Sequence, residues 1–468
     1  MSKEIELKVL ISREDLRKLL NADFMKKAIL PGSKAKHHLV SSYYDTEDLF
    51  FRKNGIVYRV RDKGDGSFEA TVKTGKKISG GITERIEMDL PLEKDEAILE
   101  GFADLGLGFE LTELAPDGVI KLFTVDVERT TYDLEFLGSS FELAVDRGKI
   151  ISDMTKSKEK IDEMEIEIKE GSVQDLLQLA SLISKTVPIF IEPRSKFARG
   201  LALIGESVSY PAEKKKLGLG PVREELMNGF TARGNAALSS QTSVIKNNFA
   251  TADVKELVKQ MQYMLSYMLL AAELDSEGIF DEYIDSTKEI LHVAKRVLDL
   301  RSMLELWRTI DLQGKFFTKT TMSITLQENI AKTEAVLLEA LRWGNLTEVF
   351  FGVQAGLASS FWDNEIYMEA ASVARGVIKK WQEELVLADD PEDELSLANN
   401  IFFLARSVDA KFAEKIAVAL KKKRNTLAIK VLEQHMEQEL IRMLQSTNSK
   451  YIYRDAGVLF GMLIGKKK

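Results

Sequence analysis

Apolar and polar residues alternate along much of the first two hundred residues. Residues 4–9 and 57–61 place an apolar side chain at every second position, which is the period of a half-buried β-strand. The same period recurs at 69–73, 82–88, 121–132, 133–136, 140–146 and 163–169. Helical spacing interrupts it at 13–20, 93–105 and 173–185. The pattern predicts a strand-rich α+β domain over residues 1–205.

The pattern changes after residue 205. Residues 206–222 contain a run with prolines, glycines and lysines that follows neither period, which indicates a linker. Beyond it, apolar residues such as Val254, Leu257 and Met261 recur at the spacing of one helix face. Residues 223–468 are therefore predicted to form an all-α helical bundle. A chain of 468 residues fits two such domains.

Composition narrows the classes of function. The 65 lysines and arginines against 73 acidic residues give a net charge of −8, which argues against a specific nucleic-acid binder. The absence of cysteine excludes thiolate nucleophiles and cysteine-bound metals, and only four histidines are present, so a metal would be held by oxygen.

Location is constrained by hydropathy. The N-terminus is charged and has no apolar run of the kind found in signal peptides. The longest apolar stretches, 263–272 and 456–465, are shorter than the roughly 20 residues that cross a bilayer. The sequence therefore predicts a cytoplasmic chain that does not bind or span a membrane.

The polar positions of the predicted strands carry many ionic side chains. Residues of the same parity share one face of a strand, so pairs such as Glu4 and Glu6 or Arg59 and Arg61 point the same way. On separate strands these faces would simply contact solvent. If they line the inside of a closed sheet, burying so much charge requires a charged ligand. A phosphate chain held by Arg and Lys, with divalent cations held by carboxylates, meets that requirement.

The ionic motifs, taken in order, resemble those of a known family. Glu4-Ile-Glu-Leu-Lys8 is similar to the opening Glu-x-Glu-x-Lys signature of the CYTH family, the triphosphate tunnel metalloenzymes. Further matches follow in the expected order: Tyr43-Tyr-Asp-Thr46, Tyr58-Arg-Val-Arg61, Thr71-Val-Lys73, Arg85-Ile-Glu87, Glu128-Arg129, Val145-Asp-Arg-Gly148, Glu165-Ile-Glu167, and Ser195-Lys196 with Arg199-Gly200. The resemblance covers essentially all of residues 1–205.

The resemblance implies an eight-stranded antiparallel tunnel barrel that hydrolyses inorganic tripolyphosphate to pyrophosphate and phosphate. It implies phosphate ligands at Lys8, Arg59, Arg61, Lys73, Arg85, Arg129 and Lys196. It implies Mg²⁺ or Mn²⁺ held by Glu4, Glu6, Asp146, Glu165 and Glu167. The expected catalytic set is Glu4, Glu6, Lys8 and Glu87, and the carboxylate that orients the attacking water stays open among Glu4, Glu87 and Glu167. Arg199 is expected in an ion pair at the tunnel end, and Tyr44 in the core.

Other activities would use the same tunnel. Adenylate cyclisation, or hydrolysis of a nucleoside or thiamine triphosphate, also needs a base or heterocycle to be recognised. The sequence offers no separate signature for that. A non-catalytic polyphosphate-binding protein is the remaining alternative, and the paired glutamates argue against it, because carboxylates beside phosphate are unfavourable without metal ions.

The helical half resembles, in a degenerate form, the CHAD domain that follows CYTH domains in bacteria and is associated with polyphosphate binding. His292 is followed by Lys295 and Arg296, but then by Asp299 where the family has basic residues. His435 is followed by Glu437 and Glu439. His292, Lys295 and Arg296 are therefore candidate contacts for long-chain polyphosphate on a CHAD-like scaffold. The basic runs 421–424 and 466–468 are expected to be solvent-exposed.

Overall fold

The computed structural model describes residues 2–79, 81–107, 109–152, 154–192, 194–206, 216–311, 321–342, 345–359 and 368–445. The chain divides into two compact units, Met1–Ala212 and Glu213–Lys468. Residues 207–215 of the predicted linker, the apolar stretch 456–465 and the terminal lysines 466–468 lie outside the described residues.

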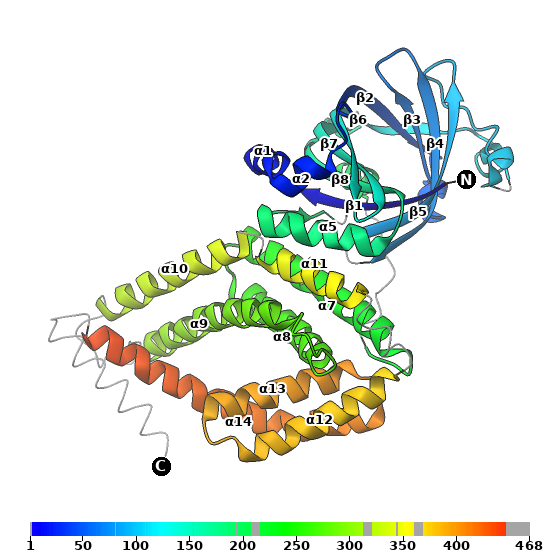
Figure 1. Ribbon diagram of the computed structural model, residues 1–468. Coiled ribbons are helices and arrows are strands. Elements are labelled where there is room, and N and C mark those ends of the chain that lie inside the picture. Colours follow the sequence, from blue (N-terminus) through cyan, green and yellow to red (C-terminus); the bar gives the residue numbers. More distant parts are fainter. Residues whose placement is uncertain are drawn as a thin grey trace. The chain divides into compact units, whose positions relative to one another are not determined.

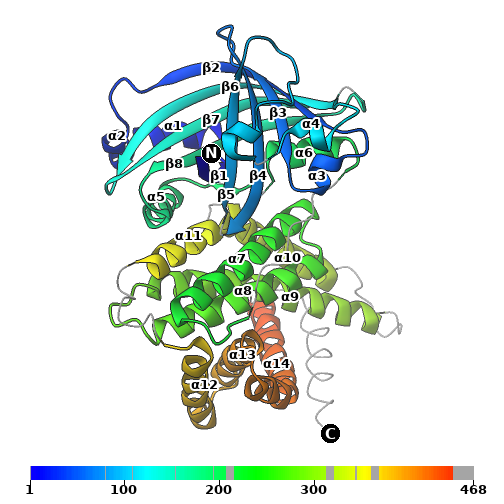
Figure 2. The ribbon, with the colours of Figure 1, turned by 90° about the vertical axis from the view of Figure 1, so that its right-hand side faces the viewer.

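The N-terminal unit is a closed antiparallel barrel (Figures 1 and 2). Its strands are β1 (Ser2–Leu10), β2 (Ala35–Asp45), β3 (Val57–Asp62), β4 (Phe68–Ser79), β5 (Ile82–Leu92), β6 (Ile120–Phe136), β7 (Ser139–Ile151) and β8 (Lys158–Glu170). The order is β5-β4-β3-β2-β6-β7-β8-β1, and β1 also pairs with β5, which closes the ring. A short strand, β9 (Phe190–Ile191), adds to β1. The predicted eight-stranded antiparallel barrel is confirmed.

Apolar side chains cover the outside of this barrel. Val60, Val72 and Met88 of β3, β4 and β5 pack with Phe51 and Phe102 in one buried cluster. A second cluster lies on the inner side of β2, β6, β7 and β8, where the last helix of the unit packs against them. The helices of the unit are α1 (Arg13–Asn21), α2 (Asp23–Ala28), α3 (Phe50–Lys53), α4 (Leu111–Leu114), α5 (Val173–Thr186) and α6 (Lys196–Leu203). Because the apolar faces of β3, β4 and β5 point outward, their alternate ionic residues are directed into the barrel.

Some predicted elements of this unit are wrong. No helix forms over 93–105; the segment is irregular and ends in a π-helical turn, Ala103–Leu107. Its apolar residues anchor it instead, because Leu99 and Phe102 are buried in the first cluster. The predicted strands 121–132 and 133–136 are one strand, β6. Strand β2 was missed because its buried and exposed positions do not alternate regularly.

The C-terminal unit is helical, as predicted. Its helices are α7 (Val222–Lys246), α8 (Thr251–Ala272), α9 (Asp281–Asp311), α10 (Thr321–Arg342), α11 (Asn345–Ala358), α12 (Ala370–Leu387), α13 (Pro391–Ser407) and α14 (Lys411–Gln445). None of the helices within the described ranges is both long and apolar enough to cross a membrane.

The end of the predicted linker is integrated into the helical unit. Leu217 is fully buried, its N–H donates to the carbonyl of Ser407, and its carbonyl accepts from the N–H of Asp409. Val222, the last residue assigned to the linker, begins α7 and is also buried. Burial of these apolar side chains explains why Gly218, Gly220 and Pro221, which lie between them, do not form a free tether.

Asp45, from the Tyr43–Thr46 motif, fixes how β2 ends. Its buried carboxylate accepts the backbone N–H groups of Thr46, Phe51 and Arg52, at 2.8, 2.8 and 2.9 Å. These bonds tie the end of β2 to the start of α3. The motif therefore has a structural role next to the barrel.

We expect Asp45→Ala to lower the free energy of unfolding by about 2 to 3 kcal/mol, because the substitution leaves several buried N–H groups without acceptors. Urea unfolding followed by the β-sheet circular dichroism signal measures the change. Glu47→Ala, at an exposed position two residues later, is the matched control and should unfold like the parent chain. An unchanged midpoint for Asp45→Ala would contradict the role assigned to these bonds.

Candidate active site

The barrel encloses a cavity of about 480 Å³ whose wall is mostly ionic. Nine lysines and arginines and eight carboxylates line it. Of the tunnel residues implied by the sequence, the following line the cavity: Glu4, Glu6, Lys8, Arg59, Arg61, Lys73, Arg85, Glu87, Arg129, Glu165, Glu167 and Lys196. Asp146 does not line it; this side chain is fully buried behind Arg129 and Lys196.

Strand pairing sets which charges face each other. Glu4 of β1 lies opposite Arg85 of β5, and Lys8 lies opposite Glu165 of β8. Between these favourable pairs, Glu6 lies opposite Glu167, which in turn lies opposite Glu142 of β7. Like charges directly opposite one another destabilise a sheet. This row of three carboxylates therefore needs cations from elsewhere in the site.

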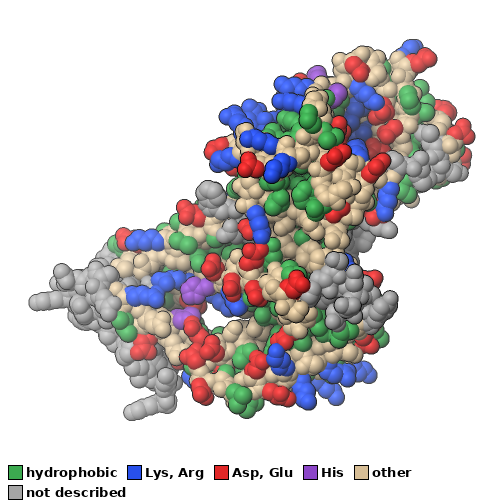
Figure 3. Space-filling view, in the orientation of Figure 1, with side chains coloured by type: hydrophobic (Ala, Val, Ile, Leu, Met, Phe, Trp, Pro, Cys, Tyr) green, Lys and Arg blue, Asp and Glu red, His purple; other side chains and the backbone are tan. Residues whose placement is uncertain are grey.

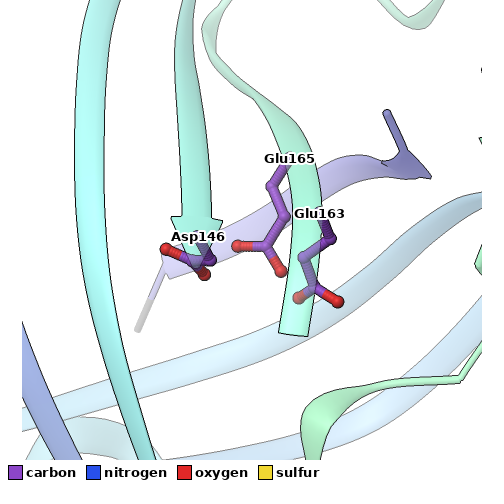
Figure 4. A group of neighbouring side chains, drawn as sticks. All are labelled: Asp146, Glu163 and Glu165. Atoms are coloured by element: carbon purple, nitrogen blue, oxygen red, sulfur yellow. The ribbon is translucent and has the colours of Figure 1, made fainter. Parts of the chain in front are cut away.

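Lys196 holds together one group of carboxylates. The three carboxylates themselves are drawn in Figure 4. Asp146 of β7 and Glu163 and Glu165 of β8 point toward one another, with ligand atoms within 4.8 Å. This spacing suits a shared cation, and the Lys196 ammonium occupies that role, at 2.7, 2.5 and 2.8 Å from the three carboxylates. Burial alone would raise the pKa of Asp146. Lys196 and Arg129 outweigh that effect and hold the pKa of Asp146 at about 2.

A second group of ion pairs crosses from β1 to β4 and β5. The Nζ of Lys73 lies 2.8 Å from Glu4 and 3.0 Å from Glu87. Arg85 contacts both Glu4 and Glu6. Glu87 also pairs with Arg59, at 3.3 Å. Burial alone would raise the pKa of Glu87, but Lys73 and Arg59 outweigh it and hold the pKa below its ordinary value.

Glu167 is the least neutralised of the predicted metal ligands. Among the described residues, its ion-pair partner is Lys169, at 2.9 Å. Burial, together with the nearby charges of Glu4 and Glu142, raises the pKa of Glu167 above its ordinary value. Glu142 itself has no ion-pair partner in the part of the chain that the structure describes. This side of the cavity therefore has an excess of negative charge, in contrast to the carboxylates around Lys196.

Arg61 presents the opposite imbalance. Its Nε donates to Ser41 at 2.9 Å, and no described carboxylate pairs with it. Glu69, its partner on β4, pairs instead with Lys63 at 2.6 Å. Burial, with Arg59 and Arg129 nearby, lowers the pKa of Arg61 to about 10. Such a guanidinium is electrostatically poised to bind an anion.

The surroundings of Arg61 carry the same sign. The Nε of Arg59 is buried without a hydrogen-bond partner. Burial would raise the pKa of Tyr43, yet Arg59 and Arg61 outweigh it and lower that pKa. The cationic and anionic imbalances are thus on different parts of one cavity wall.

Three side chains near the cavity differ from or extend the expectations. Glu163, which was not selected from the sequence, is fully buried and binds both Lys196 and Arg199. It has the same parity as Glu165 and Glu167 on β8, and that period was a signal for it. Arg199 forms the expected ion pairs, at 2.7 Å from Glu159 and Glu163. Tyr44 packs against the outer core cluster, whereas its neighbour Tyr43 lines the cavity.

The candidates of the helical half lie on α9, and carboxylates accompany them. His292 is exposed, while Lys295 and Arg296 are half-buried. His435 of α14 bonds to Asp299 at 2.9 Å and to Glu392 at 2.5 Å. Figure 3 shows the histidines of this unit among both acidic and basic side chains.

The pKa shifts of this group reflect its mixed charges. Burial lowers the pKa of Lys295 and raises that of Asp299. Burial would lower the pKa of His435, but Glu392 and Asp299 outweigh it and raise that pKa. Carboxylates thus offset the charge of the basic residues that the sequence brings to this place.

Comparisons with known proteins agree with this geometry. The CYTH domain model matches residues 2–201. An inorganic triphosphatase of Haemophilus influenzae is 28% identical over 293 residues, which cover 62% of this chain and 81% of the relative. The aligned stretch is longer than the domain match, so the likeness continues into the helical half.

Solved structures were also compared. A Hippeastrum protein described as an adenylyl cyclase with a dominant triphosphatase activity is 19% identical, covering 43% of this chain and 96% of that one, with a TM-score of 0.31. The RNA triphosphatase domain of a mimivirus mRNA capping enzyme is 14% identical, covering 39% and 87%, with a TM-score of 0.22. These TM-scores are low, so the family assignment depends on the domain match, the homologous triphosphatase and the closed ionic barrel. Residues 2–201 of this chain are a CYTH domain.

Proposed function

We propose that the CYTH domain hydrolyses inorganic tripolyphosphate to pyrophosphate and phosphate inside the barrel. The observation that carries this proposal is Arg61, a half-buried guanidinium that faces the cavity with two further arginines nearby and no carboxylate partner among the described residues. A bound phosphate chain would supply the missing negative charge through charge-assisted hydrogen bonds. We assign phosphate contacts to Arg61, Arg59, Arg129, Lys8, Lys73, Arg85 and Lys196.

The charge balance of the wall supports a metal requirement. With nine cations against eight carboxylates, the wall is close to neutral before substrate arrives. A phosphate chain carries several negative charges and would leave the occupied cavity strongly negative. Divalent cations that enter with it restore the balance, and glutamate oxygens are suitable ligands for Mg²⁺ or Mn²⁺.

We propose Glu4, Glu6 and Glu167 as the carboxylates that would hold the metal. Glu6 and Glu167 are opposite each other on β1 and β8, and within the described ranges the ion-pair partner of Glu167 is a lysine two residues away. A bound divalent ion would lower the negative charge of the phosphate chain as the phosphoanhydride bond breaks. Asp146 is fully buried behind the wall and shares both Lys196 and Arg129 with Glu165, so we propose that these two carboxylates position the two cations.

The contacts of Glu87 favour a positioning role as well. It is paired with Lys73 and Arg59, and these cations lower its pKa. A carboxylate with a lowered pKa is a weak base for an attacking water. We therefore propose that Glu87 holds Lys73 and Arg59 in place for the substrate, and that the water is oriented from the Glu4 and Glu167 side.

An inorganic substrate is favoured over a nucleoside or thiamine triphosphate. The cavity wall contains two aromatic rings, Tyr43 and Phe197. Their centroids lie 5.8 Å apart, and both rings also pack on Phe123, at 5.0 and 6.0 Å. Both are almost fully buried, so neither offers an open face on which a heterocycle could stack.

A substrate panel tests the proposed activity. Purified full-length chain, with Mg²⁺ or Mn²⁺, is given tripolyphosphate, ATP, thiamine triphosphate and long-chain polyphosphate, and the release of phosphate, pyrophosphate and cyclic AMP is measured. We expect tripolyphosphate to have the highest kcat/KM. Arg61→Gln should lower that kcat/KM about 30-fold or more, because a charge-assisted contact is lost. Cyclic AMP as the main product, or full activity of Arg61→Gln, would contradict the proposal.

The metal assignment is tested separately. Glu167→Gln should raise the Mg²⁺ or Mn²⁺ concentration needed for half-maximal activity about 10- to 100-fold, because a charged oxygen ligand is removed while the basic wall stays intact. Glu69→Gln is the matched control: Glu69 also lines the cavity but pairs with Lys63. An identical metal dependence for Glu167→Gln and the parent chain would remove Glu167 from the metal site.

For the helical half we propose at most weak polyphosphate binding at His292, Lys295 and Arg296, because Asp299 and Glu392 lie close to Lys295. Replacing all three residues with Gln should leave tripolyphosphatase activity within about twofold of the parent, since the distances and charges of the barrel are untouched. Titration of the parent and the triple variant with long-chain polyphosphate at low and physiological salt completes the test. If the parent chain binds long-chain polyphosphate tightly and the triple variant does not, this cluster is a polyphosphate receptor.

A further inference from the structure

A second cavity lies within the helical unit and has a different chemical character from the barrel. It has a volume of about 530 Å³ and is formed by α8, α9, α13 and α14. Its cations are Lys255, Lys259, Arg406, Lys421 and Arg424, and none of the described residues that line it is acidic. A cationic pocket without carboxylates is unusual in a chain whose net charge is −8. The pocket is therefore suited to an anion.

Most of these cations are not neutralised by the protein. Lys259 pairs with Glu256, at 2.8 Å. Lys255, Arg406 and Lys421 are exposed to solvent at the mouth of the cavity and Arg424 is half-buried, and none of the four has an ion-pair partner among the described residues. The Nη1 of Arg424 is buried without a hydrogen-bond partner, and burial lowers the pKa of Arg424. Because no described carboxylate pairs with these four cations, an anionic ligand would form ion pairs with them without breaking existing ones.

The remaining part of the wall is apolar and aromatic. Val258, Leu298, Val418, Phe402 and Phe403 form most of it, and Tyr263, Ala417 and the polar Gln262 complete the lining. The guanidinium of Arg424 lies 3.8 Å from the centre of the Phe402 ring and 5.3 Å from that of Phe403. Stacking on a ring fixes the plane of the guanidinium, which can then present a flat surface to a ligand. An inorganic phosphate chain would leave this apolar half unused.

We propose that this cavity binds a nucleoside phosphate, with the phosphate near Lys421, Arg406 and Lys255 and the base against the apolar wall and the Arg424 plane. The volume is within the range of pockets that bury small organic ligands. Base stacking on planar groups together with phosphate neutralisation is a common way to bind nucleotides. The proposal concerns the helical unit alone and does not depend on the substrate of the barrel.

Calorimetric titration of the full-length chain with AMP, without metal ions, tests this proposal. AMP is chosen because it carries a single phosphate group, whereas the barrel is proposed to bind a chain of three. Arg424→Gln should weaken AMP binding about tenfold or more, and Arg406→Gln with Lys421→Gln should do so without touching the aromatic contacts. Lys430→Gln, exposed on α14 but outside the cavity, and Arg61→Gln in the barrel are the matched controls and should bind AMP like the parent chain.

The other outcomes each contradict the proposal. No AMP binding at millimolar concentration, or loss of binding in Arg61→Gln alone, would exclude this pocket as the site. Equal affinity for adenosine would mean that the cations play no part. Equal affinity for inorganic phosphate or tripolyphosphate, with the same dependence on Arg424, would mean that the apolar wall plays no part. In every variant the tripolyphosphatase assay of the barrel reports separately whether the first proposal holds.

Discussion

Neutralisation of buried charge is the constraint on which the N-terminal unit depends. A closed sheet with its apolar faces outward has to direct its polar positions inward, where an unpaired ion is costly. The barrel meets this cost locally by surrounding Lys196 with three carboxylates and by pairing Lys73 and Arg85 with those of β1 and β5. These pairs leave a positive charge at Arg61 and a negative charge at Glu167 poorly neutralised. The two positions define where ligands of the opposite charge fit.

The sequence predicted the barrel because period-two alternation and ordered ionic motifs are both local signals. It could not predict which charges neutralise each other, since Lys196 meets Asp146 only through strand register and the placement of α6. The prediction of Asp146 as a metal ligand was therefore made without knowledge of the Lys196 ammonium beside it. Strand β2 was missed because its buried and exposed positions do not alternate regularly, whereas the helix at 93–105 is absent because tertiary burial of Leu99 and Phe102 overrides local spacing.

In the helical unit the sequence predicted the helices, but it did not predict which side chains of different helices lie next to one another. Helix packing brings His435 to Asp299 of α9, so carboxylates accompany the basic residues of the degenerate motif. The three lysines of the basic run 421–424 are exposed, as expected, whereas Arg424 is half-buried and lines a cavity together with Lys421. That environment depends on Phe402 of the preceding helix, which contacts Arg424 from outside the run.

Strand β1 has a consequence for how the protein is made. It is the first strand in the chain, yet its neighbours are β5 and β8, and Glu6 is opposite Glu167. During synthesis from the N-terminus, β1 emerges early and cannot be flanked on both sides until β8 has left the ribosome. Such distant pairing is slow, because a long loop has to close before any contact forms. The part of the cavity wall that β1 contributes is consequently among the last parts of this domain to assemble.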